Sequence, residues 1–169
     1  MTKNKNMVEK LNKKNIYSGS SPNGYGVTHF AKRDFKKDEI VMYGFGRIIN
    51  HQTPHISIQI GLHKHYLPTK WTGKYWNHSC DPNTYIHTNS DGFPNLVALK
   101  DIKKDEEITY AYYMSEFSWI ENADENKVRC VCGNSKCKGK ILSFSQLSNK
   151  EKRKLKQRKL CSDYLLACG

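Results

Sequence analysis

Short apolar runs alternate with groups of turn-forming residues along most of the chain. From Ile56 to Ile60, apolar and polar residues alternate with a period of two, which is typical of a half-buried β-strand. Other short runs, rich in β-branched and aromatic residues, predict strands over residues 27–31, 39–44, 47–49, 85–88, 94–99 and 107–113. Many short strands with little helix between them predict a compact, mainly β domain.

The two ends of the chain lack this strand pattern. Residues 1–14 are rich in Lys and Asn and show no periodicity, so we expect a flexible basic arm there. Ser148, followed three residues later by Glu151, matches the capping box that begins many helices. Apolar residues then recur at helical spacing at Cys161, Tyr164, Leu165 and Cys168. Together these features predict a basic C-terminal helix within residues 143–169.

The net charge is distributed unevenly along the chain. The 169 residues carry a formal net charge of +12, yet residues 15–137 contain 14 basic and 13 acidic residues. Residues 1–14 contain five Lys and one Glu, and residues 138–160 contain nine Lys or Arg and one Glu. The basic ends therefore allow non-specific contact with nucleic acid, for which the body has no excess charge. A nuclear-import signal, an anchor to an anionic surface and a solvated helix, which we favour, also fit the second basic stretch.

Length and hydropathy limit the class of protein. A chain of 169 residues leaves room for one domain with a modest core. It contains no run of about 20 apolar residues, so we expect no membrane contact. The first residues include lysines but no apolar segment behind them, so we expect no secretory signal and an intracellular protein.

Three of the six cysteines lie within eight residues and indicate a metal site. Their spacing is C-x-C-x4-C, at Cys130, Cys132 and Cys137. Neighbouring thiolates of this kind suit tetrahedral Zn²⁺. The alternatives are a disulfide, which an intracellular location disfavours, and plain reduced thiols. A closed zinc site needs a fourth ligand, for which Cys80 is the best candidate, although counting alone does not exclude Cys161 or Cys168.

Four motifs occur in a fixed order along the chain. They are Gly24-Tyr25-Gly26-Val27, Asn77-His78-Ser79-Cys80-Asp81-Pro82-Asn83, Glu106-Glu107-Ile108-Thr109-Tyr110-Ala111-Tyr112 and the cysteine run that begins at Cys130. In order and spacing they resemble the SET-domain protein lysine methyltransferases that carry a post-SET zinc-binding cysteine cluster. The resemblance covers roughly residues 17–142.

The resemblance implies a SET-domain fold of several small β-sheets with short helices. In that fold the segment after residue 106 threads under a loop to form a pseudoknot, which would bring Asn77 and His78 beside Tyr112. The chain would then divide into the flexible arm at 1–14, a SET domain at 15–125, a post-SET zinc segment at 126–142 and the basic C-terminal helix at 143–169.

The same resemblance implies roles for individual residues. S-adenosyl-L-methionine would be held by Gly24, Tyr25, Gly26, Asn77 and His78. One zinc ion would be held by Cys80, Cys130, Cys132 and Cys137. Tyr112 would be the catalytic tyrosine that orients the substrate lysine. Tyr110 stands where the family has Phe or Tyr, and its hydroxyl occupies space that further methylation needs, so we expect mono- or dimethylation.

Two segments depart from the common family pattern. Lys74-Tyr75-Trp76 replaces the residues that often precede the Asn-His motif, and we expect an effect on packing. The insert between Ile60 and Trp71 is very short and contains His63, His65 and Tyr66. The two histidines could be read as metal ligands, but we favour a position on the surface or lining the substrate site.

The implied function is a protein-lysine N-methyltransferase that uses S-adenosyl-L-methionine. Its partner would be a protein that bears a target lysine, such as a histone tail, in the nucleus, the cytoplasm or, for a bacterial effector, a host nucleus. Acidic residues late in the domain either attract such a basic tail or form a solvated surface: Glu106, Glu107, Glu116, Glu121, Asp124 and Glu125. A non-catalytic SET-fold peptide-binding protein and a basic zinc protein associated with nucleic acid are the alternatives.

Overall fold

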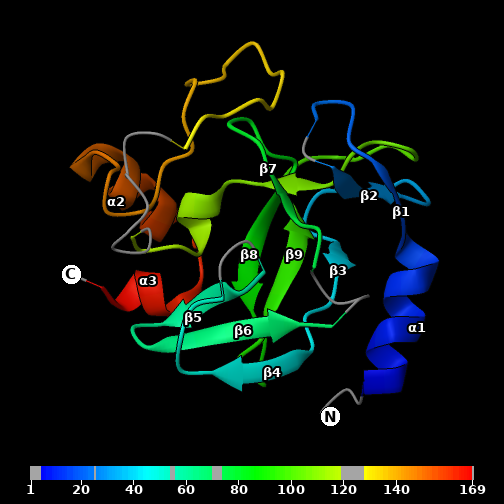
Figure 1. The fold of residues 1–169 in the computed structure, drawn as a ribbon, viewed down its shortest axis with the longest axis horizontal. Coiled ribbons are helices and arrows are strands. Elements are labelled where there is room, and N and C mark those ends of the chain that lie inside the picture. Colours follow the sequence, from blue (N-terminus) through cyan, green and yellow to red (C-terminus); the bar gives the residue numbers. More distant parts are fainter. Residues whose placement is uncertain (1–4, 25, 54–55, 70–73, 119–127, 169) are drawn as a thin grey trace.

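The computed structural model describes residues 5–24, 26–53, 56–69, 74–118 and 128–168 (Figure 1). The elements in chain order are α1 (Lys5–Asn15), β1 (Ile16–Ser20), β2 (Val27–Ala31), β3 (Ile40–Met42), β4 (Gly46–Ile49), β5 (Ile58–Gly61), β6 (Lys64–Pro68), β7 (Asn77–His78), β8 (Thr84–Thr88), β9 (Pro94–Ala98), β10 (Thr109–Tyr110), the 3₁₀ helix η1 (Tyr112–Met114), α2 (Asn149–Gln157) and α3 (Asp163–Ala167). The predominance of short strands confirms the predicted mainly β fold. None of the described helices is long and apolar enough to cross a membrane.

The strands of the described part form four small sheets. β1 pairs with β2, β9 lies between β3 and β8, and β6 lies between β4 and β5, all with antiparallel neighbours. The fourth sheet is a parallel pair in which Asn77 of β7 lies opposite Thr109 of β10, and His78 lies opposite Tyr110. This pair joins two motifs that are far apart in sequence.

One apolar core lies between the sheets and the C-terminal helices. Tyr66 of β6 is fully buried in it, together with Phe35, Ile102 and Phe144. The Tyr66 hydroxyl donates to the Phe45 carbonyl and accepts from the Phe45 N–H, both at 3.1 Å, so its polar group is satisfied. Tyr66 is therefore a core residue, and the expectation of a surface position was wrong for it. Its neighbour His65 is 7% exposed, so a surface position is wrong for that histidine as well, whereas His63 is exposed.

The N-terminal segment is a docked helix, so the expected flexible arm is wrong for residues 5–14. Val8 is buried, and the Asn12 side chain accepts from the Tyr43 N–H and donates to the Tyr43 carbonyl, both at 2.9 Å. The Asn15 side chain donates to the Val41 carbonyl at 3.0 Å. These asparagines bind backbone groups around β3, which fixes α1 against the sheet on the side opposite α2 and α3 (Figure 1).

The C-terminal segment contains two helices rather than one. The capping box is confirmed, because Ser148 Oγ accepts from the Glu151 N–H and the Glu151 carboxylate accepts from the Ser148 N–H. After α2 the backbone reverses at Lys159, whose φ is +51°, and Leu160 N–H donates back to the Leu155 carbonyl. This reversal ends α2, and the predicted apolar positions from Cys161 to Cys168 all follow it, with Tyr164 and Leu165 inside α3.

The last predicted strand, residues 107–113, is strand only at β10 and then turns into η1. The backbone just before and within β10 is held by the side chains of Asn83, just before β8, and Thr84, the first residue of β8. Asn83 donates to the Glu107 carbonyl at 2.8 Å and accepts from the Thr109 N–H at 2.9 Å. Thr84 Oγ1 donates to the Thr109 carbonyl at 2.8 Å. The turn that follows places Tyr112 on η1 instead of on the strand face of Tyr110.

Candidate active site and metal centre

His78 and Tyr112 are brought together by the β7–β10 pair. The Tyr112 N–H donates to His78 Nδ1 at 3.2 Å, and the two rings meet edge to face with centroids 5.2 Å apart. This contact confirms the expected approach of the Asn77–His78 motif to the tyrosine segment. Burial lowers the pKa of His78 to about 4, so the ring is neutral near neutral pH.

The hydrogen bond from Tyr112 also fixes the tautomer of His78. Because Nδ1 accepts a backbone N–H, the single ring proton of the neutral form lies on Nε2. Nε2 is 3.5 Å from Cys80 Sγ, so this N–H points at the sulfur. The histidine therefore links the tyrosine segment to the cysteine cluster.

The Tyr112 hydroxyl is held by the backbone just before β7. It donates to the Trp76 carbonyl at 3.1 Å. Burial raises the pKa of Tyr112 above its ordinary value, and the carboxyl group of Glu116 adds to this shift. The phenol therefore stays protonated and oriented at any physiological pH.

Tyr110 and Trp76 complete an aromatic wall around Tyr112. The Tyr110 ring lies 5.1 Å from the Tyr112 ring and meets the Trp76 ring edge to face at 6.1 Å. Tyr110 is 3% exposed and Trp76 is 5% exposed. The sequence predicted only a packing effect for Trp76, whereas the structure places it in contact with both tyrosines. Its position next to the Asn-His motif was the available signal.

The glycine turn between β1 and β2 keeps an open backbone. Gly24 and Gly26 both have φ of +79°, a conformation that side chains disfavour, and a Cβ on either would meet no atom within 4 Å. The turn is closed by a hydrogen bond of 2.7 Å from the Ser21 N–H to the Gly26 carbonyl. Tyr25 lies outside the described residues. The two glycines thus present main-chain groups that no Cβ of their own covers, which fits the cradle that the sequence predicted.

Glu107 connects the glycine turn to the Asn-His motif. One of its carboxylate oxygens accepts from Ser21 Oγ at 3.0 Å and from Asn77 Nδ2 at 3.4 Å. Asn77 Nδ2 also lies 3.5 Å from the Val27 carbonyl. The sequence placed Glu107 in an acidic surface group, whereas its carboxylate here orients a side chain of the predicted cofactor site.

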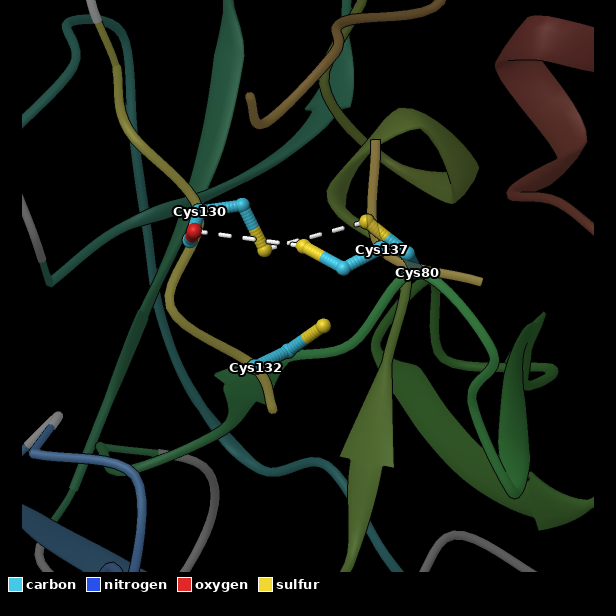
Figure 2. A group of neighbouring side chains, drawn as sticks. All are labelled: Cys80, Cys130, Cys132 and Cys137. Carbon is cyan, nitrogen blue, oxygen red and sulfur yellow. Dashed lines mark hydrogen bonds between the residues drawn. The ribbon is translucent and has the colours of Figure 1, made fainter. Parts of the chain in front are cut away.

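The four predicted zinc ligands converge on one point. Cys80, from the loop after β7, meets Cys130, Cys132 and Cys137 so that all four Sγ atoms lie within 4.8 Å of one another (Figure 2). Cys161 and Cys168 do not belong to this group, so the structure selects Cys80 as the fourth member. The Cys80 and Cys130 sulfurs are 3.7 Å apart. Two sulfurs on a tetrahedral zinc ion at ~2.3 Å would be separated by about 3.8 Å, so this donor set fits Zn²⁺.

The surroundings of the cluster also suit thiolates bound to a cation. Burial, with the neighbouring Cys130, raises the pKa of Cys80 to about 12. Four clustered thiolates therefore need a positive charge among them. The N–H of Lys138 points at Cys80 Sγ and that of Gly139 points at Cys137 Sγ, at 3.5 and 3.4 Å. These donors stabilise negative sulfur.

A small hollow lies where the cluster meets the Asn-His motif. Its lining residues are His78, Cys80, Tyr113, Lys138, Lys140 and Leu142. Residues 128–142 thus supply one side of the surface onto which His78 opens. The cysteine segment and the predicted cofactor site are consequently parts of one arrangement.

Comparisons with known proteins agree with this geometry. The sequence model of the SET domain family matches residues 24–113. A histone-lysine N-methyltransferase of Emericella nidulans, H3 lysine-4 specific, is 28% identical over 153 residues, which covers 79% of this chain and 12% of that protein. The histone-lysine N-methyltransferase mes-4 of Caenorhabditis elegans is 29% identical over 146 residues, which covers 69% of this chain and 15% of that protein.

A solved structure from Plasmodium falciparum, described as that of a candidate histone methyltransferase, is also similar. It shares 28% identity with a TM-score of 0.48 and covers 57% of this chain and 90% of that one. The chain spans only about an eighth of the length of the curated relatives it matches. The family match covers more than half of the chain, on the residues that build the site, and the chain therefore belongs to the SET domain family.

Proposed function

We propose that this protein is a protein-lysine N-methyltransferase that uses S-adenosyl-L-methionine. The observation that carries the proposal is the convergence of the glycine turn, the Asn77–His78 motif and the Tyr110–Tyr112 segment, which the β7–β10 pair and Glu107 hold together. The cofactor would be held by Gly24, Tyr25, Gly26, Asn77 and His78. It supplies an electrophilic methyl group on a sulfonium when bound.

The aromatic wall suits the amine that must attack that methyl group. A free lysine has a pKa of about 10.4, so its deprotonation at pH 7 costs about 4–5 kcal/mol. A narrow aromatic channel disfavours the ammonium form and lowers that cost. Tyr110, Tyr112 and Trp76 would line such a channel, and the fixed Tyr112 hydroxyl would orient the amine at the reacting end.

The role of zinc in this proposal is structural. Four protein thiolates fill a tetrahedral site and leave no open position for a reacting group. The ion would tie the residues after 128 to the loop after β7, next to His78. Cys80, Cys130, Cys132 and Cys137 would be its ligands.

Mono- or dimethylation follows from the Tyr110 hydroxyl in this proposal. The hydroxyl is buried and lies 3.4 Å from Ser115 Oγ, so it occupies fixed space beside Tyr112. Tyr110→Phe would remove it and shift the products toward higher methylation. Mass spectrometry of a methylated peptide measures this directly, and an unchanged distribution would remove Tyr110 from the proposal.

The proposed substrate is a histone tail or another basic protein, in line with the names of the curated relatives, and the proposed location is the nucleus. The acidic residues were expected either to attract such a tail or to form a solvated surface. Both expectations are wrong for Glu116, because its side chain is 5% exposed and cannot form part of a surface. Glu107 is half-buried and bound to Asn77, while Glu106 is exposed. Glu121, Asp124 and Glu125 lie outside the described residues.

A methyl-transfer assay tests the proposed function. Wild-type protein with radiolabelled S-adenosyl-L-methionine should label core histones or proteins of a cell lysate. Tyr112→Phe should lower transfer by about 100-fold or more, while calorimetry shows cofactor affinity changed by only a few-fold. Cofactor binding without transfer would indicate the non-catalytic peptide-binding alternative. The absence of both cofactor binding and methyl transfer would favour the remaining alternative, a basic zinc protein associated with nucleic acid.

A further inference from the structure

A buried carboxyl group lies directly behind the tyrosine wall. Glu116 follows η1 and is 5% exposed. Its Oε1 accepts from the Gln59 N–H of β5 at 3.0 Å and from Ser115 Oγ at 3.1 Å. Its Oε2 is also buried and has no hydrogen-bond partner in the described part of the chain. A buried carboxyl group with one oxygen unsatisfied among the described residues calls for an explanation beyond packing.

The groups that face Glu116 are hydroxyls and not cations. Tyr110 of β10, Tyr112 of η1 and Tyr164 of α3 all interact electrostatically with its carboxylate. The ion pairs found among the described residues do not include Glu116. Burial raises the pKa of Glu116 to about 7, so the group changes charge near neutral pH. A buried carboxylate without a cation destabilises the fold, and such groups concentrate at functional sites.

Ser115 connects this carboxyl group to Tyr110. Ser115 Oγ lies 3.1 Å from Glu116 Oε1 and 3.4 Å from the Tyr110 hydroxyl. A serine hydroxyl has one proton to donate. When Glu116 is ionised, Ser115 gives that proton to the carboxylate, and its oxygen can then only accept from Tyr110. The phenol proton of Tyr110 is thereby directed at Ser115.

Protonation of Glu116 removes this constraint. A neutral carboxyl group no longer requires the Ser115 proton, and Ser115 Oγ also lies 3.4 Å from the Tyr112 carbonyl as a second acceptor. The Ser115 hydroxyl can then donate either to Glu116 Oε1 or to the Tyr112 carbonyl, so the direction of the Tyr110 proton is less defined.

We propose that Glu116 is a positioning residue that acts through Ser115 to orient the Tyr110 hydroxyl and so limits the number of methyl groups transferred. This inference rests on the proposed function for its second half, the methyl count. Its first half, the coupling of Glu116 to Tyr110, concerns the protein alone.

The first test measures products. Glu116→Gln keeps the shape of the side chain, and Ser115→Ala removes the connection but keeps the carboxylate. Glu9→Gln, at a partly exposed glutamate of α1, is the control outside the site. Mass spectrometry should show the ratio of higher to lower methylation rising at least twofold in Glu116→Gln and Ser115→Ala. Neither substitution should change the ratio further in a Tyr110→Phe background. A loss of total activity with an unchanged ratio would reduce Glu116 to a purely structural residue and overturn the proposal.

The second test needs no activity. With tyrosine labelled at ¹³Cζ, the Tyr110 signal is assigned by its loss in Tyr110→Phe. It should shift with pH around pH 7 in wild type and stay constant in Glu116→Gln. Should Glu116→Gln fail to fold, Ser115→Ala serves in its place, because it leaves the bond from Gln59 to the carboxylate intact.

The two tests separate the two ideas. A wild-type protein that transfers no methyl group while the Tyr110 signal titrates would refute the proposed function and leave the coupling standing. The coupling would be refuted, and the proposed function would stand, if the wild type is active and Glu116→Gln changes neither the pH response of the Tyr110 signal nor the product ratio.

Discussion

Glu116 places an ionisable side chain inside the core, and the free energy of unfolding must therefore depend on pH. Its pKa rises from 4.5, the ordinary value, to about 7 in the folded protein because of burial. Between these values the folded protein binds more protons than the unfolded chain. The contribution of this group is complete below about pH 4.5 and is lost as the pH rises through 7.

The expected result is a pH-dependent difference between Glu116→Gln and wild type. Because the glutamine cannot ionise, the variant should gain about 3 kcal/mol of unfolding free energy relative to wild type between pH 4.5 and pH 8. Urea denaturation at several pH values measures this. His29, whose pKa burial lowers to about 4, destabilises both proteins alike as the pH falls below 6.5, so it cancels in the comparison. A difference that does not vary with pH would contradict the raised pKa.

At the scale of elements, α1 depends on polar side chains for its attachment. Asn12 makes two hydrogen bonds of 2.9 Å to the backbone of Tyr43. Asn12→Ala would remove both of these hydrogen bonds from a fully buried side chain, and we expect a loss of about 2–3 kcal/mol of unfolding free energy. Asn6→Ala, at an exposed position of the same helix, should change it by less than about 0.5 kcal/mol. Equal, small effects of both substitutions would mean that the segment is not docked in solution.

The cysteine segment has only a small apolar cluster of its own among the described residues. Cys130, Cys132 and Ile141 are its buried apolar residues, and its backbone closes through a 2.8 Å bond from the Ile141 N–H to the Val128 carbonyl. A cluster of this size needs a staple. We therefore expect one zinc ion per chain by elemental analysis.

Substitution of a ligand should remove that zinc. Cys80→Ser and Cys137→Ser should purify without metal and melt about 10 °C lower, whereas Cys168→Ser, outside the cluster, should retain one ion. Thiol titration after chelation separates the alternatives. All six thiols of the chain should react, including the four of the cluster, and a count of four would indicate a disulfide instead.

The same elements show which features the sequence could predict. The strands β2, β3, β4, β5, β8 and β9 and the cap at Ser148 follow from local pattern and propensity, whereas β6 and β7 were not predicted. The helix at α1 does not follow from local pattern, because Asn12 binds the backbone of Tyr43, which is distant in sequence. β1 was missed since Ser18 to Ser20 have low strand propensity and are held by pairing with β2. Tertiary partners override local preference at both places.

The candidate site likewise contains residues whose place could be predicted from the sequence and residues whose place could not. The C-x-C-x4-C spacing was sufficient to gather three of the cysteines, while the family resemblance supplied Cys80 and the approach of His78 to Tyr112. Trp76 and Glu116 were misjudged, since an aromatic or a glutamate looks alike in sequence whether it faces solvent or the core. Only the packing of β5, β10 and η1 distinguishes these environments.

For the whole molecule, part of the excess charge forms one face of α2. Lys150, Arg153, Lys154 and Arg158 are exposed and three or four residues apart, so they share a side of the helix. The charge complements a phosphate backbone, which supports a nucleic-acid contact of the proposed enzyme when its substrate is a nucleosome. Deletion of the helix cannot test this, because Leu155 and Leu165 are buried in the core.

Replacing these four residues with Gln tests the contact while keeping the helix. Affinity for duplex DNA should lose salt dependence, with the slope of log K against log salt becoming shallower by about 3 to 4. Methyl transfer to nucleosomes should fall with it, while transfer to a free peptide should stay within twofold of wild type. A second variant, in which Lys10, Lys13 and Lys14 of α1 are replaced with Gln, tests the other basic end of the chain for comparison. An effect confined to the α1 variant would assign the contact to that end, and equal loss on peptide and nucleosome would show that α2 supports folding instead.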